Sequence, residues 1–189
     1  MTNITITVDV MMEKRPCTEW PRERVAAYLG EGKTLTAMLR DALANNDISI
    51  QDAIWGVTRF LPDKINRAFA IWCARQCKTN VKEITDYIDT IERYYAGEAT
   101  SEELNAAGRA ANRAAYSVAD WAADWAAGRA ADRAGYWAAD WAADRAAHWA
   151  AYRAANWAAD CATDWAAYWA ARKLQAEKLI EMIDAVKGE

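Results

Sequence analysis

The sequence predicts an all-α fold, a compact helical bundle with a short N-terminal β-strand or extended arm. Residues Arg109–Arg172 form sixteen consecutive four-residue units, nearly all of the form x-Ala-Ala-y. Upstream of them, apolar residues recur at three- and four-residue spacing, the period of a helix that packs on one side. Residues 4–10 alternate in the manner of a strand. At 189 residues, the chain can bury a core without metal or disulfide staples.

Residues 1–20 are expected to form an N-terminal extended arm. The segment 4–10 reads Ile-Thr-Ile-Thr-Val-Asp-Val, and we find no obvious partner strand for it later in the chain. Three interpretations stay open, in decreasing order of preference. The segment is a disordered arm, an isolated extended segment, or a strand that a second copy of the protein completes.

Residues 21–100 are expected to form an N-terminal helical part. Its first helix, Arg22–Leu29, is closed by Gly30. Thr34 caps a second helix that reaches about Ala44, and Asp47 or Ser49 caps the third.

Two further helices are expected in the same part, one opened by Pro62 and one over residues 81–95 that ends at Gly97. The apolar faces of the three helices after residue 46 are predicted to be Ile50, Ala53, Ile54, Val57 and Phe60; Ile65, Ala68, Phe69, Trp72, Cys73 and Gln76; and Ile84, Ile88, Ile91 and Tyr95.

Residues 101–189 are expected to hold the tetrad-repeat helices and a closing amphipathic helix, with 21–189 forming one domain. Thr100-Ser101-Glu102-Glu103 is predicted to cap this region. Four residues advance about 400° around a helix, so the x position drifts about 40° per unit. The run is therefore expected to break into three or four helices, with Gly128, Gly135 and 161–164 as candidate breaks. The closing stripe is predicted to be Leu174, Leu179, Ile180, Ile183 and Val186.

The repeat has an unusual side-chain inventory that supports two interpretations. It contains eight of the chain's eleven Trp, seven Arg and seven Asp, with no Lys or Glu. In the structural interpretation, the indoles cover the Ala faces of neighbouring helices while each Asp pairs with an Arg from another helix. In the functional interpretation, Trp and Tyr stack on a nucleobase and Arg clamps a phosphate. The candidate ligand-binding residues are Trp121, Trp125, Trp137, Trp141, Trp149, Arg129, Arg133, Arg145, Arg153, His148, Tyr152, Asp140 and Asp144.

Composition argues against several functional classes. The net charge is −4 and the repeat has no basic stripe, which disfavours a long nucleic acid as partner. The start of the chain does not resemble a signal peptide, and charges interrupt every apolar run, so we expect no membrane partner. The four Cys follow no disulfide spacing, and we therefore expect a cytoplasmic protein. His148 is the single histidine, and we find no catalytic motif. The expectation is no catalytic residue, metal or cofactor.

Several segments in order resemble a known family. These are the helix pair Leu35–Phe60, the string LPDKINRAFAIWCA from Leu61 to Ala74, Tyr95-Ala96-Gly97-Glu98, and then the tetrads. Together, over roughly residues 34–172, they are similar to a family of Ala-rich helical immunity proteins of bacteria and their phages. The resemblance implies a binding and neutralising role rather than catalysis, and it carries over no functional residues.

The predicted function is that of a non-catalytic binding protein in bacterial or phage immune conflict. It sequesters a small nucleotide-type signalling molecule, a cyclic nucleotide or an ADP-ribose derivative. The alternative is an immunity or inhibitor protein that binds a bacterial toxin or defence enzyme through a Trp/Arg-rich face. A second alternative is a structural module that forms homo-oligomers through residues 4–10 and the Ala-rich helices.

Overall fold

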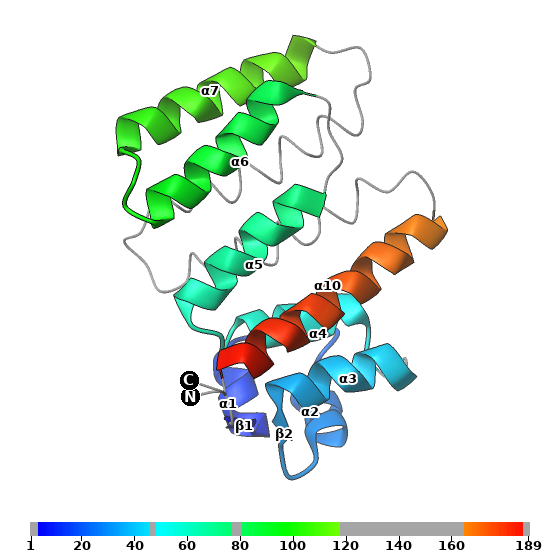
Figure 1. Ribbon diagram of the computed structural model, residues 1–189. Coiled ribbons are helices and arrows are strands. Elements are labelled where there is room, and N and C mark those ends of the chain that lie inside the picture. Colours follow the sequence, from blue (N-terminus) through cyan, green and yellow to red (C-terminus); the bar gives the residue numbers. More distant parts are fainter. Residues whose placement is uncertain (1–3, 46–47, 77–80, 118–164, 187–189) are drawn as a thin grey trace. The chain divides into compact units, whose positions relative to one another are not determined.

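The computed structural model describes residues 4–45, 48–76, 81–117 and 165–186 (Figure 1). Within them the all-α prediction is confirmed, since eight helices accompany a single two-stranded sheet. The strands are β1 (Thr5–Ile6) and β2 (Lys33–Thr34). The helices are α1 (Val8–Glu13), α2 (Arg22–Leu29), α3 (Leu35–Asn45), α4 (Ile50–Thr58), α5 (Asp63–Gln76), α6 (Lys82–Tyr95), α7 (Ser101–Ser117) and α10 (Trp165–Ala185).

The chain divides into two compact units. The first consists of Met1–Leu61 and Ala176–Glu189, and the second of Pro62–Gln175. Helix α10 contributes residues to both units. None of the described helices is both long and apolar enough to cross a membrane.

The predicted short N-terminal β-strand is confirmed as β1, and its partner strand lies in the same chain. β1 pairs antiparallel with β2 of the same chain, with Thr5 opposite Thr34 and Ile6 opposite Lys33, and the Ile6 side chain is fully buried. Gly32 makes this approach feasible, because its φ is 130° and a side chain there would collide with Thr5. Val8, Asp9 and Val10 of the alternating segment are helical and form the start of α1. The partner strand β2 has only two residues, which is too short to produce an alternating pattern that could be recognised in the sequence.

The capping signals of the first unit were predicted correctly. Helix α2 has the predicted bounds and ends at Gly30, which has a φ of 56°. The Thr34 hydroxyl accepts a hydrogen bond from the Ala37 N–H at 3.2 Å, at the start of α3. Ser49 caps α4, and its hydroxyl accepts a hydrogen bond from the Asp52 N–H at 3.0 Å.

The core of the first unit is formed by α3, α4 and the apolar residues of the shorter elements. Figure 1 shows α3 beside α4. Gly56 of α4 allows close packing, since a Cβ there would lie 3.2 Å from Cε of Met38 and 3.5 Å from Cε of Met11. The predicted α4 face holds for its central residues Ala53, Ile54 and Val57, which are fully buried.

In the second unit, α6 and α7 lie side by side (Figure 1). Gly108 of α7 permits the contact, because a Cβ there would lie 3.1 Å from the Tyr87 ring of α6. At the start of α7 the capping box is confirmed. The Thr100 N–H donates to Glu103 Oε2 at 2.7 Å, and the Glu103 N–H donates to the Thr100 hydroxyl at 3.2 Å.

The predicted apolar faces of α5 and α6 are largely correct. Ile84, Ile88 and Ile91 of α6 are buried, and Tyr95 is half-buried. On α5, Ala68 and Gln76 are exposed, which corrects the sequence-based face. Their place in the core is taken by Asn66, Ala70, Ile71 and Ala74.

The predicted stripe of the closing helix is only partly correct. Leu179 and Ile183 are buried, whereas Leu174 and Val186 are 46% and 37% exposed. The buried side of α10 continues backward through Ala176, Gln175 and Arg172 at helical spacing. The sequence-based stripe failed here because a hydrophobic pattern cannot assign buried positions to polar residues. The candidate breaks of the tetrad run, and the number of helices it forms, lie outside the described residues.

Candidate functional site

All thirteen predicted ligand-binding residues lie between residues 118 and 164, outside the described part of the chain. The structure does describe the last two tetrads, Trp165-Ala-Ala-Tyr168 and Trp169-Ala-Ala-Arg172, at the start of α10. Residues at the same position of successive tetrads are four apart, so they lie on the same side of a helix. Tyr168 and Arg172 are such a pair.

Arg172 is the most deeply buried charged side chain of the described residues. It is 2% exposed. Its Nε and Nη2 groups donate to the Tyr168 hydroxyl at 3.2 and 3.1 Å, and its Nη1 group donates to Gln175 Oε1 at 3.4 Å. Both partners are neutral. In the described part of the chain, no carboxylate forms an ion pair with Arg172.

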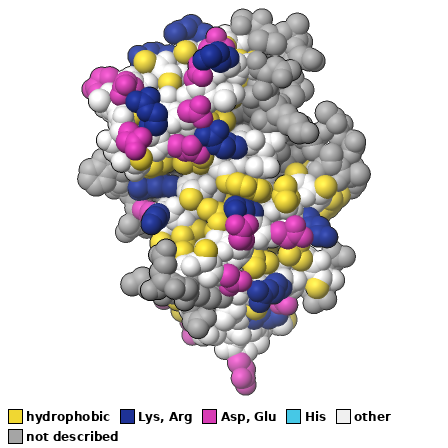
Figure 2. Space-filling model, in the orientation of Figure 1, with side chains coloured by type: hydrophobic (Ala, Val, Ile, Leu, Met, Phe, Trp, Pro, Cys, Tyr) yellow, Lys and Arg dark blue, Asp and Glu magenta, His cyan; other side chains and the backbone are white. Residues whose placement is uncertain are grey.

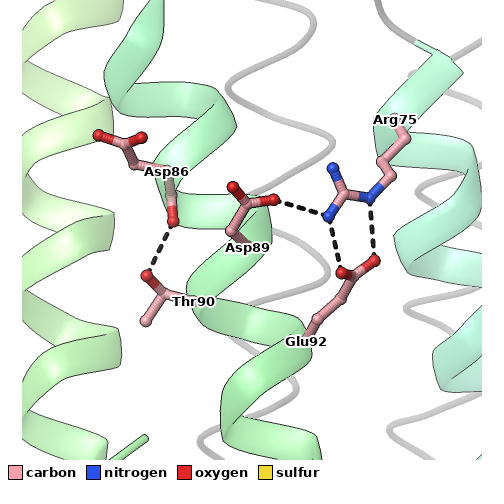
Figure 3. Close-up of polar contacts among 5 residues, drawn as sticks. All are labelled: Arg75, Asp86, Asp89, Thr90 and Glu92. Carbon is pink, nitrogen blue, oxygen red and sulfur yellow. Dashed lines mark hydrogen bonds and ion pairs between the residues drawn. The ribbon is translucent and has the colours of Figure 1, made fainter.

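Arg75 of α5 illustrates the usual environment of an arginine in the same unit (Figure 3). Its Nε and Nη2 groups donate to the two carboxylate oxygens of Glu92 at 2.9 and 2.7 Å, and Nη2 also donates to Asp89 at 2.7 Å. The Arg75 side chain is 38% exposed. The more exposed arginine therefore has two carboxylate partners, whereas the partners of the buried one among the described residues are a phenol and an amide.

The positive charge of Arg172 acts on the Cys73 thiol. Cys73 is a fully buried residue of α5. Burial raises the pKa of this thiol well above its usual range, and the positive charge of Arg172 opposes the rise without cancelling it. A thiol with a raised pKa is neutral at pH 7, so Cys73 does not supply a counter-charge to Arg172.

An aromatic pair adjoins the arginine on α10. The Arg172 guanidinium lies 5.1 Å from the centroid of the Tyr168 ring, within cation–π range. The Tyr168 and Trp169 rings meet edge to face, with centroids 5.6 Å apart. Trp169 is 42% exposed. This arrangement places an exposed indole, that of Trp169, beside a tyrosine ring that contacts a buried arginine.

On the face drawn in Figure 2, Lys and Arg side chains are interspersed with Asp and Glu side chains. Among the described residues, no group of three or more His, Cys, Asp or Glu is arranged to hold a metal ion.

Sequence reasoning missed Arg172, although a signal for it is present. The fourth position of the other fifteen tetrads holds Asp, Asn, Tyr, His or Gly, and Arg172 is the one arginine there. The residue that departs from the repeat is thus the arginine that is buried.

No protein-family model, curated protein or solved structure was found to match the chain.

Proposed function

We propose that the protein is a non-catalytic binding protein that sequesters a small nucleotide-type molecule in bacterial or phage immune conflict. Aromatic faces would stack on the base, and arginines would contact the phosphate. The observation that carries the proposal is the group formed by Tyr168, Trp169 and Arg172 at the end of the tetrad run. It combines an exposed indole with an arginine that contacts a tyrosine ring.

The composition of the repeat supports a small ligand over a polymer. Long nucleic acids are bound by basic surfaces that neutralise many phosphates. This chain has a net charge of −4, and its tetrad run balances seven Arg with seven Asp. A few arginines beside aromatic rings suit a ligand that carries only a few phosphates.

A thermal-shift screen tests the proposal directly. The full chain is heated with cyclic dinucleotides, cyclic mononucleotides and ADP-ribose derivatives at saturating concentration. A ligand that binds the folded state must raise Tm by mass action. The expected result is a rise with at least one of these classes, and a flat response to all of them rejects the proposal.

Two substitutions inside the run separate binding from folding. Arg145→Ala and Trp141→Ala are expected to abolish the Tm rise while the far-ultraviolet circular dichroism stays that of the wild type. If either variant unfolds, that residue belongs to the core rather than to a ligand site.

The runner-up function is an immunity or inhibitor protein that binds a toxin or defence enzyme. Trp169 favours it, because a 42% exposed indole is a typical anchor of a protein–protein interface. Under this hypothesis, Trp169→Ala would weaken capture of that enzyme, and no nucleotide would change Tm. We also propose that the protein is cytoplasmic, that it forms homo-oligomers and that it belongs to the family of Ala-rich immunity proteins.

A further inference from the structure

The chain crosses between its two units at two places, and the local structure differs between them. The first crossing, between Leu61 and Pro62, lies in the non-helical turn that joins α4 to α5. The second crossing, between Gln175 and Ala176, lies inside α10, which continues through it as an unbroken α-helix. One helix therefore supplies residues to both units.

The residues around the second crossing favour a continuous helix. Residues 173–179 read Lys-Leu-Gln-Ala-Glu-Lys-Leu, and all of them are good helix formers. This stretch contains no Gly, Pro or N-capping residue that could end one helix and begin another. In an α-helix each N–H bonds to the carbonyl four residues earlier, so the N–H groups of residues 176–179 pair with the carbonyls of residues 172–175. These backbone hydrogen bonds join the two parts of α10 across the crossing.

The buried side of α10 also continues across the crossing. In the second unit it includes Arg172 and Gln175, which are 2% and 1% exposed. In the first unit it includes Ala176, Leu179 and Ile183, which are fully buried. These positions recur at three- and four-residue spacing, so they form a single stripe on one side of the helix. Both parts of that stripe are kept from water.

Each part of α10 is linked to another element of its own unit. In the second unit, the charge of Arg172 acts on the buried Cys73 of α5. In the first unit, Arg40 of α3 donates to Asp184 at 3.3 Å. Because this ion pair is exposed, it contributes little by itself. The burial of Leu179 therefore makes the larger contribution to holding α10 in the first unit.

We propose that α10 couples the two units, so that local opening of the first unit unwinds α10 and opens the second unit as well. A secondary-structure element with two discrete states, here wound and unwound, can carry energetic coupling between distant parts of a protein. Release of Leu179 would remove the hydrogen bonds across the crossing and thereby free Arg172. Such coupling is reciprocal, so a ligand that binds the second unit would also stabilise the first. The inference is independent of the proposed function, because it is tested without a ligand.

Maleimide labelling of Cys73 measures how often the second unit opens. Cys73 is buried in α5, whereas Cys17 is exposed and serves as the reference in the same sample. The labelled peptides of the full-length protein are quantified by mass spectrometry. Leu179→Ala removes buried apolar contacts in the first unit. We expect it to accelerate labelling of Cys73 at least about tenfold and to leave Cys17 unchanged.

Leu174→Ala is the matched control, because it makes the same change in the same helix. Leu174 belongs to the second unit, as Cys73 does, but it is 46% exposed. We expect labelling of Cys73 in this variant to stay within about twofold of the wild type. A purely local effect on the second unit would give the opposite order, with Leu174→Ala the more disruptive change. That order would overturn the inference.

Amide hydrogen exchange of α3 and α4 shows whether a variant has opened the first unit. If exchange there rises in Leu179→Ala while Cys73 is labelled at the wild-type rate, the units open independently and the inference is overturned. Ile183→Val replaces Leu179→Ala if the latter fails to fold, since it removes a single methylene from a fully buried side chain. The expected acceleration of Cys73 labelling is then about threefold.

A Gly-Gly-Gly insertion between Gln175 and Ala176 tests whether α10 itself carries the coupling. The insertion keeps both parts of the helix and weakens its continuity at the crossing. Labelling is compared within this background, with and without Leu179→Ala. We expect the two rates for Cys73 to agree within about twofold, because the connection through α10 is broken. A tenfold acceleration that persists in this background would overturn the role of α10.

Discussion

The Tyr168 hydroxyl accepts two hydrogen bonds from Arg172, from Nε at 3.2 Å and from Nη2 at 3.1 Å. The two residues occupy the fourth positions of the last two tetrads, and the four-residue repeat brings them together on one side of α10. A single neutral atom thus satisfies two donors of a buried charge. This relationship links the four-residue period of the sequence to the hydrogen bonding of a buried arginine.

Tyr168→Phe should destabilise the protein, because it removes the acceptor and leaves two buried donors without a partner. Unsatisfied buried donors cost about 1–3 kcal/mol. The measurement is the free energy of unfolding in urea. Tyr94→Phe is the matched control, since it deletes a hydroxyl from a half-buried tyrosine of the same unit, and we expect a change below about 0.5 kcal/mol there. Equal effects of the two changes would contradict the role given to Tyr168.

Gly108→Ala tests the close approach of α6 and α7. The added Cβ would lie 3.1 Å from Cζ and 3.2 Å from the hydroxyl oxygen of Tyr87. Alanine favours a helix over glycine by about 1 kcal/mol, whereas overpacking costs about 1–3 kcal/mol. We expect a net loss of about 1 kcal/mol in urea unfolding. A stabilised variant would mean that the two helices can separate without cost.

Arg75→Ala should cost little, although its ion pairs are well formed (Figure 3). Arg75 and both carboxylate side chains are more than one-third exposed, and exposed ion pairs contribute about 0–1 kcal/mol. The loss should shrink further in 1 M sodium chloride, where the Debye length falls to about 3 Å. A loss that is large and independent of salt would contradict this assignment.

The capping box at the start of α7 predicts a specific dependence on pH. Hydrogen bonding by the Thr100 N–H lowers the pKa of the Glu103 carboxyl, with a further contribution from Arg93. A pKa that is lower in the folded state means that the contribution to stability is present above the unfolded pKa. That contribution is lost as the pH falls through the folded pKa.

Glu103→Gln is the variant that isolates this effect. Glutamine can accept the same backbone hydrogen bond but does not titrate. The urea midpoints of the wild type and of Glu103→Gln should differ most near pH 7 and converge toward pH 3. A difference that stays constant over this range would show that the charge of Glu103 is irrelevant.

Much of the fold could be predicted from local signals. Capping residues such as Ser49 and Thr100 act through hydrogen bonds within three residues, and the structure confirms them. The β1–β2 pair escaped prediction, because its contact links residues far apart in sequence through only two positions on each strand. Its local signal was a glycine, Gly32, whose role depends on the partner strand.

The candidate site was less predictable than the fold. Hydrophobic periodicity assigns apolar residues to the core, so it predicted that Leu174 is buried. In the structure Leu174 is exposed, and Arg172 and Gln175 are the buried residues. Whether an arginine can be buried depends on the hydrogen-bond partners that surround it in the folded protein, and the spacing of apolar residues does not predict those partners. The residues selected from the middle of the tetrad run lie outside the described chain, and they stay predictions.

A tryptophan fluorescence titration is the most direct test of the central claim that the protein sequesters a nucleotide-type ligand. The ligand class that raises Tm is added to the full chain, which carries eleven Trp, and the ligand is recovered afterwards and analysed by mass spectrometry. The account predicts a saturable quench from base stacking and a ligand recovered chemically unchanged. No quench with any cyclic nucleotide or ADP-ribose derivative would contradict binding, and recovery of an altered ligand would contradict sequestration.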